Sequence, residues 1–323
     1  MQDQKNNPDR ASLLAEIAEL YYLEGKDQAE IANSVGVTRS MISRMLKEAR
    51  QSGIVEVRIH RSMESDPGLE SELQQRFALK RVHVTRGDPS RSASLVKQLG
   101  AAAAQVLAEY LTPGIIIGLA WGISIGATVD AFDARRRVPA RVVQLAGALG
   151  ARNAEYDGYG LVQRFAQKIG GESYFLNAPC YCPTPEMVQS LLETPAIRET
   201  VELGRQAGVA LLGVGSTQRK YSSFYRSGYI PSQEIDRLHE LGAVGNVCGT
   251  HFNILGESVC EDFSDHLVVI RREDLLGIPV RLGVSGGPGK AVPILGALRG
   301  GFLNVLVTDA ATARKVLELS ATA

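Results

Sequence analysis

Residues 38–47 combine side chains that bind DNA with the spacing of one helical face. Arginine can donate two hydrogen bonds to a guanine edge, and serine, threonine and lysine reach bases or phosphates. Among these polar positions, Ile42, Leu46 and Ala49 recur at helical spacing and predict an inward apolar stripe. We therefore expect a DNA-reading helix. The residues expected to contact DNA are Gln28, Thr38, Arg39, Ser40, Ser43, Arg44 and Lys47.

The positive charge of this helix is local. Residues 38–50 hold four Lys or Arg against Glu48 alone, a net charge of +3. Residues 1–60 hold eight Lys or Arg against nine Asp or Glu, a net charge of −1, and the whole chain is neutral. Attraction to nucleic acid must therefore come from this patch. The alternative is an ordinary three-helix module with a solvated polar face.

A second set of residues fits the binding of an anion. Glycine-bearing turns follow apolar runs at residues 119–124, 146–150, 213–217 and 286–290. Glycine lets a ligand approach the backbone, and free N–H groups at a helix start favour an anion. Ser124 adds a hydroxyl and Lys290 a cation, a pair that suits a phosphate. The alternative for each turn is plain fold geometry, and for Lys290 a solvated surface lysine.

The sequence fits nucleotide binding and metal binding less well than it fits anion binding. The run GVSGGPGKA is not a nucleotide P-loop, because its first glycine is one residue too far from Gly289 and Ala291 replaces the hydroxyl that holds Mg²⁺. Cys180 and Cys182 with His251 resemble metal ligands, but this C-x-C pair has no matching second pair. We expect buried free thiols, no metal and no cofactor.

The alternative to a binding protein is an enzyme with an appended DNA-binding domain. It would need a positioned base or nucleophile. Asp262 and Asp265, with His251 and His266 nearby in the sequence, have no recognisable catalytic spacing. We therefore assign no catalytic residue and expect no enzyme.

The first 60 residues predict a winged helix-turn-helix that would position the DNA-binding side chains. Apolar residues from Leu13 to Tyr21 recur at helical spacing before Gly25. Asp27 with Glu30 three positions later predicts a capping box for a short second helix. A turn at 36 and an N-cap at 38 lead into the third helix, and IVEVRIH (54–60) alternates like a wing strand.

The rest of the chain predicts an α/β fold. Residues 61–79 form a polar connector and a short helix, LESELQQRF. Over residues 80–323, near-continuous apolar runs alternate with amphipathic helices, which predicts a Rossmann-like, mainly parallel sheet covered on both faces. The expected strands include residues 81–85, 243–249 and 266–270. Ligands of such sheets bind beyond the carboxyl ends of the strands. We therefore expect residues 80–323 to bind an effector and to form the oligomer.

The bulk composition is that of a globular protein. The chain has 323 residues, of which 45% are hydrophobic and 22% charged, enough for a small domain and a larger one. No apolar run approaches the ~18–20 residues that span a bilayer, and the N-terminus lacks a signal-peptide core. We expect a cytoplasmic protein that does not contact the membrane.

The order of these motifs resembles the SorC family of sugar-responsive bacterial transcriptional regulators. The resemblance covers almost the whole chain. Its most specific segments are LYYLEGKDQAEIANSVGVTRSMISRMLKEARQSGIVEVRI, GLAWGISI, VVQLAGALG, FYRSGYI, AVGNVCG and IPVRLGVSGGPGKAVPILGALRGGFLNVLVTDAATARKVL.

The resemblance implies a sensor domain of the sugar-phosphate isomerase/CoA-transferase-like fold in a homodimer or homotetramer. The enzyme alternative is then a sugar-phosphate isomerase or transferase with an appended DNA-binding domain. The implied partners are operator DNA and a phosphorylated sugar or polyol, and a repressor is the implied role. Carried over by position, the effector-binding residues are Gly122, Ile123, Ser124, Gly147, Asn246 and Lys290.

One of these positions departs from the family. Asn246 stands where the family has Asp, so hydroxyl recognition must differ from that of a carboxylate, which can only accept hydrogen bonds. Trp121, beside this site, is either a packing residue or a stacking surface for the ligand.

Overall fold

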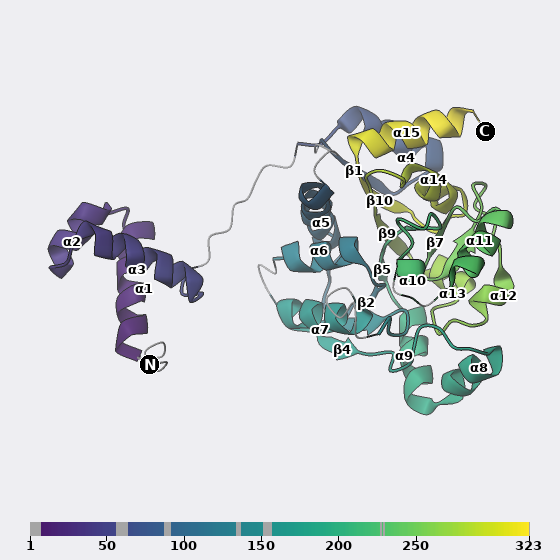
Figure 1. Ribbon diagram of the computed structural model, residues 1–323, viewed down its shortest axis with the longest axis horizontal. Helices are drawn as coiled ribbons and strands as arrows, with labels where there is room; N and C mark the ends of the chain where they lie inside the picture. Colours follow the sequence, from purple (N-terminus) through teal and green to yellow (C-terminus); the bar gives the residue numbers. More distant parts are fainter. Residues whose placement is uncertain are drawn as a thin grey trace. The chain divides into compact units, whose positions relative to one another are not determined.

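The computed structural model describes residues 8–55, 64–86, 92–133, 137–150, 157–226, 228 and 230–322. The chain divides into two compact units, Met1–Ser62 and Met63–Ala323 (Figure 1). Within the described residues, no helix is long and apolar enough to cross a membrane.

The small unit is a three-helix domain with the expected caps. Asp27 accepts hydrogen bonds from the backbone of Ala29 and Glu30, and Glu30 accepts one from the Asp27 backbone, so the predicted capping box is confirmed. Gly36 ends the second helix in the left-handed conformation. The expected wing strand lies largely outside the described residues. The helices are α1 (Pro8–Tyr22), α2 (Gln28–Val35) and α3 (Arg39–Gln51).

A seven-stranded sheet forms the centre of the larger unit, and every neighbouring pair of its strands is parallel. The strand order is β1-β10-β9-β5-β2-β3-β4, so strands far apart in the sequence become neighbours. The predicted parallel α/β fold is confirmed. The strands are β1 (Arg81–Thr85), β2 (Ile116–Leu119), β3 (Arg141–Gln144), β4 (Glu172–Tyr174), β5 (Val209–Leu212), β9 (Val280–Val284) and β10 (Val305–Asp309).

Helices cover both faces of this sheet. One apolar core joins it to α5 (Ser92–Ala108), α6 (Ile123–Ala131) and α7 (Gly158–Ile169) (Figure 1). The opposite core includes α4, α9, α13, α14 and α15. The bounds of the other helices are α4 (Pro67–Phe77), α8 (Pro185–Glu193), α9 (Pro195–Arg205), α10 (Ser223–Arg226), α11 (Ser232–Glu240), α12 (Glu261–Ser264), α13 (Arg272–Gly277), α14 (Ala291–Arg299) and α15 (Ala310–Ala321).

A second, antiparallel sheet lies outside the parallel one. It contains β6 (Gly215–Ser216), β7 (Gly245–Val247) and β8 (Thr250–Phe252). Cys248 and Gly249 form the turn between β7 and β8, and both have positive φ, as a two-residue hairpin turn of type I′ requires. The sequence alone predicted the 243–249 run as a strand of the parallel sheet, which is wrong.

Two other segments differ from the expectation. Residues 266–270, expected as a strand, make only isolated bridges, in which Leu267 pairs with Tyr181 and Val269 with Ala146. Helix α4, which the sequence analysis placed in a linker, packs against β1 and α15 and buries Leu73 completely.

Candidate functional site

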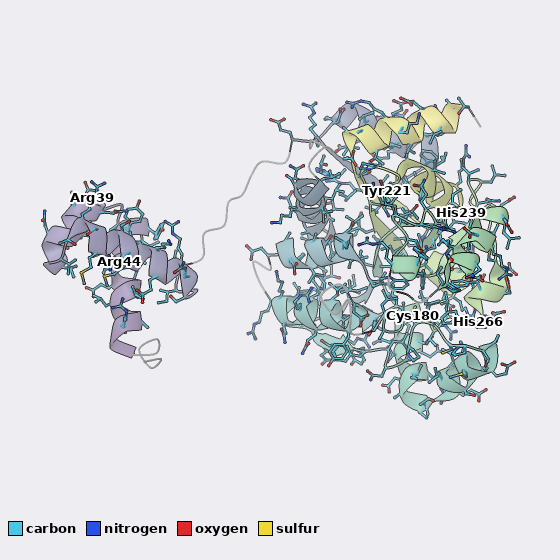
Figure 2. All side chains as sticks on the ribbon, in the orientation of Figure 1. Arg39, Arg44, Cys180, Tyr221, His239 and His266 are labelled. Carbon is cyan, nitrogen blue, oxygen red and sulfur yellow. The ribbon has the colours of Figure 1, made fainter. Side chains whose placement is uncertain are left out.

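Helix α3 separates apolar and polar side chains as the sequence predicts. Ile42, Leu46 and Ala49 are buried against α1 and α2, and so is Met45. The side chains on the other face are exposed, and Figure 2 labels Arg39 and Arg44 among them. The hydroxyl of Thr38 accepts a hydrogen bond from the Met41 backbone N–H at 3.3 Å, which fixes the start of the helix. The exposed residues are Thr38, Arg39, Ser40, Ser43, Arg44 and Lys47, whereas Gln28 is half-buried at the start of α2.

An ion pair holds the only acidic side chain of α3. Nε and Nη2 of Arg10, in α1, donate hydrogen bonds to the two carboxylate oxygens of Glu48 at 2.9 and 2.6 Å. The carboxylate raises the pKa of Arg10. The exposed face of α3 is therefore cationic, because its one negative charge is paired within the domain. Arg10 was not predicted from the sequence, because no spacing rule connects positions 38 residues apart.

Three of the glycine-bearing turns lie together at the carboxyl ends of neighbouring strands of the parallel sheet. Strand β5 lies between β2 and β9, so the turns that follow these strands are neighbours. A Cβ atom built on Gly213, after β5, would lie 3.6 Å from the backbone oxygen of Trp121, after β2. Gly122 has a φ of 127°, which glycine adopts readily, and α6 begins at the next residue. The half-buried Ser124 lies in the first turn of α6, while Ile123 is 46% exposed.

Lys290 reaches the turn after β5. Its Nζ donates a hydrogen bond to the backbone oxygen of Val214 at 2.6 Å. Burial lowers the pKa of the Lys290 ammonium to about 8. A partly buried cation with one neutral partner is a suitable counter-charge for an anionic ligand.

Asn246 lies against the same turn from the antiparallel sheet. It pairs with Gly215 across β6 and β7, and its side chain is buried. A Cβ atom on Gly215 would lie 2.6 Å from the Asn246 Nδ2 atom, so glycine is needed for this contact. Lys290 and Asn246, which are far apart in the sequence, therefore contact two adjacent residues after β5, Val214 and Gly215.

Gly147 has a different environment from the other expected effector-binding residues. Its N–H donates to the backbone oxygen of Val268 at 2.8 Å. A Cβ atom at this position would lie 2.7 Å from the backbone oxygens of Ala178 and Pro179. Close backbone packing therefore explains why this residue is glycine, with no ligand needed for the explanation. Its N–H also already has a hydrogen-bond partner.

The cysteines considered as metal ligands and the aspartates considered as catalytic groups have the environments of structural residues. All four cysteines are free and buried, and no group of three or more potential metal ligands occurs in the described part of the chain. Burial raises the pKa of Cys248 to about 12 and that of Cys260 to about 11, which disfavours a reactive thiolate. Asp262 and Asp265 form exposed ion pairs with Arg237 and Arg271.

Asp309, which was not predicted from the sequence, shapes the turn that carries Lys290. This fully buried carboxylate accepts hydrogen bonds from the Gly287 N–H at 2.7 Å and from the Thr312 N–H and hydroxyl at 3.0 and 2.6 Å. The sequence does indicate such a role, because Asp309 follows an apolar strand and stands at the start of a helix, the position of an N-cap residue.

Aromatic residues also border the site. Tyr221 lies so close to Gly289 that a Cβ atom there would be 2.6 Å from its ring (Figure 2). Trp121 contacts Phe224 edge to face, with ring centroids 5.6 Å apart, and this contact favours the packing alternative.

Comparison with known proteins points to one family. A family model described as "Putative sugar-binding domain" matches residues 61–318. The chain is 33% identical over 313 residues to a transcriptional regulator LsrR from Enterobacter sp. (strain 638), covering 95% of this chain and 93% of that protein. It is 29% identical over 314 residues to the sorbitol operon regulator of Klebsiella pneumoniae, covering 97% and 99%. It is 27% identical over 309 residues to the deoxyribonucleoside regulator of Bacillus subtilis (strain 168), covering 96% and 98%.

Solved structures agree with these relatives. The full-length sorbitol operon regulator SorC of Klebsiella pneumoniae has a TM-score of 0.72 at 28% identity, covering 96% of this chain and 99% of that one. The sugar-binding domain of a transcriptional repressor from Vibrio fischeri has a TM-score of 0.73 at 27% identity, covering 79% and 100%.

Proposed function

This chain belongs to the SorC family of transcriptional regulators with a sugar-binding domain, and from this premise we propose that a sugar phosphate or related metabolite controls its binding to operator DNA. The observation that carries the proposal is the meeting of Lys290 and Asn246 at the Val214–Gly215 turn. A cation and a neutral amide at one strand end suit a ligand with an anionic group and hydroxyls. The exposed cationic face of α3 supplies the DNA-binding surface.

The proposed DNA interface is the exposed face of α3. Arg39 and Arg44 are the candidates for reading base edges in the major groove, and Lys47 for binding phosphate. The proposed contact extends along the start of α2 and the first half of α3 through Gln28, Thr38, Ser40 and Ser43. A single domain of this size offers a small interface, so we propose that a homodimer or homotetramer binds two half-sites ~34–36 Å or a multiple apart.

The proposed effector site lies at the carboxyl ends of β2, β5 and β9. Backbone N–H groups at Gly122, Ile123 and Ser124 begin α6 and would favour an anion there. Lys290 would exchange the Val214 carbonyl for that anion. Asn246 both donates and accepts hydrogen bonds, so it would bind hydroxyls without repelling the anionic group. We leave Gly147 out of this site because its amide is already bonded.

Regulation requires the effector to bind one conformation of the protein better than another. A tenfold change in operator affinity needs about 1.4 kcal/mol of coupling, an ordinary value for allostery. We therefore expect the effector to change operator affinity by roughly 5–150-fold. Release of a repressor from DNA is the direction we propose. A regulator that binds chromosomal operators would work in the cytoplasm.

A thermal-shift screen with sugar phosphates and free polyols tests this proposal, followed by operator titration with and without each stabilising ligand. We expect a ligand that raises the melting temperature and changes operator affinity without being consumed. Turnover of the ligand would favour the enzyme alternative. A ligand that binds stoichiometrically but changes neither operator affinity nor oligomeric state would overturn the proposed control.

A further inference from the structure

His251 is a buried polar residue directly opposite Asn246. The two residues pair in the antiparallel register of β7 and β8, so their side chains lie on the same face of the small sheet. His251 is 2% exposed, and its Nδ1 atom has no hydrogen-bond partner among the described residues. Asn246, on the same face, is 5% exposed. Among the described residues, the His251 Nδ1 atom therefore lies unpartnered beside a buried amide.

The surroundings of His251 are aromatic, apart from a backbone hydrogen bond with Gly249. Its ring centroid lies 6.1 Å from that of Phe224 and 5.1 Å from that of Phe263, and Phe224 contacts Trp121 in turn. A phenyl ring would suit this aromatic cluster but lose the bond with Gly249, and that bond leaves the unpartnered Nδ1 unexplained. Buried polar atoms without partners are uncommon in folded proteins, and each needs a physical explanation. Trp121 immediately precedes Gly122, so the cluster borders the proposed effector site.

The imidazole of His251 is uncharged at neutral pH, since burial lowers its pKa to about 4. A neutral imidazole carries one N–H donor and one lone-pair acceptor. Such a group can exchange hydrogen bonds with a hydroxyl, which also both donates and accepts a hydrogen bond. It does not attract a second anionic group as a cation would.

We propose that His251 is a further effector-binding residue, which together with Asn246 binds hydroxyl groups at the uncharged end of a phosphorylated sugar or polyol. Lys290 would bind the anionic end. The inference rests on the proposed function above. Because Nδ1 is inaccessible in the ligand-free protein, a hydroxyl reaches it only when surrounding groups move. The bond then exists in one conformation alone, which is the condition for a ligand to shift a conformational equilibrium.

The test compares the full-length protein with His251→Phe, which keeps the aromatic packing and removes the ring nitrogens. The matched control is His266→Phe, because His266 stacks on Tyr181 in the same region while its Nδ1 is already bonded to the Cys182 oxygen at 2.9 Å (Figure 2). Calorimetric titrations use sorbitol 6-phosphate, fructose 6-phosphate and ribose 5-phosphate, with inorganic phosphate as the probe of the anionic end alone.

We expect His251→Phe to weaken the tightest-binding sugar phosphate about 3–10-fold, the effect of one neutral hydrogen bond, and to leave inorganic phosphate binding unchanged. His266→Phe should bind all probes as the wild type does. Unchanged sugar-phosphate affinity in a folded His251→Phe variant would overturn the inference and leave the proposed function standing, as would an equal loss for inorganic phosphate. Failure of all four probes to bind the wild type would overturn both.

Discussion

Replacing Lys290 with methionine should stabilise the ligand-free protein and remove anion binding. The pKa of Lys290 falls from 10.5 to about 8 because the ammonium is buried. Each pKa unit corresponds to ~1.4 kcal/mol, so carrying the charge in the folded state at pH 7 costs about 3 kcal/mol. Methionine also loses the charged hydrogen bond to the Val214 oxygen, which is worth ~1.5–3 kcal/mol. The net gain in unfolding free energy should therefore be small, at most about 1.5 kcal/mol.

The pH dependence of this gain follows from the direction of the shift. Below pH 8, Lys290 is charged in both the folded and the unfolded states, so the wild type bears the full cost. Between pH 8 and 10.5 the folded state loses its proton first, and the cost declines. Above 10.5 both states are neutral and the cost is gone. The advantage of Lys290→Met should thus be full at pH 7 and clearly smaller at about pH 9.5.

Denaturant unfolding at these two pH values measures the stability, and calorimetry with the sugar-phosphate panel measures the binding. The loss of a charged hydrogen bond should weaken the phosphorylated ligand about 10–150-fold, while operator affinity without effector stays at the wild-type value. Lys315→Met is the control, since Lys315 is an exposed lysine paired with Glu318. Wild-type affinity for the ligand in Lys290→Met would refute the assignment of the anion site, and a loss of stability at pH 7 would refute the electrostatic argument.

Four other substitutions test three separate parts of the molecule. Arg44→Ala should cost ~1–3 kcal/mol of operator binding in a footprinting titration and relax specificity at one base, whereas Lys47→Ala should weaken all sequences alike; unchanged footprints for Arg44→Ala would remove it from the interface. Asn246→Asp should disfavour phosphorylated ligands relative to free polyols, because an ionised carboxylate repels the phosphate; calorimetry that finds the same ligand ranking would contradict this. Asp309→Asn should lower the unfolding free energy by ~1–3 kcal/mol, because an amide cannot accept all the bonds that Asp309 accepts; an unchanged denaturant midpoint would be inconsistent with them.

The sequence was sufficient for features that depend on neighbouring residues. The capping box of Asp27 and Glu30 and the left-handed Gly36 involve contacts within a few positions, so the residue types specify them. The buried stripe of α3 follows from the 3.6-residue period of a helix. Strand β1 and the parallel sheet were predictable because strands buried on both faces are continuous apolar runs. The resemblance to the family also came from the sequence.

Only the tertiary structure decided which distant residues meet. Strand order placed the turns after β2, β5 and β9 together, and a separate sheet placed Asn246 beside Gly215 and opposite His251. Backbone packing accounted for Gly147, and a contact over 38 positions paired Arg10 with Glu48. A single sequence cannot give these pairings, because an apolar strand or a charged side chain has many possible partners of similar chemistry. The choice among them comes from the packing of the whole chain, in which each contact is favourable only when the others form.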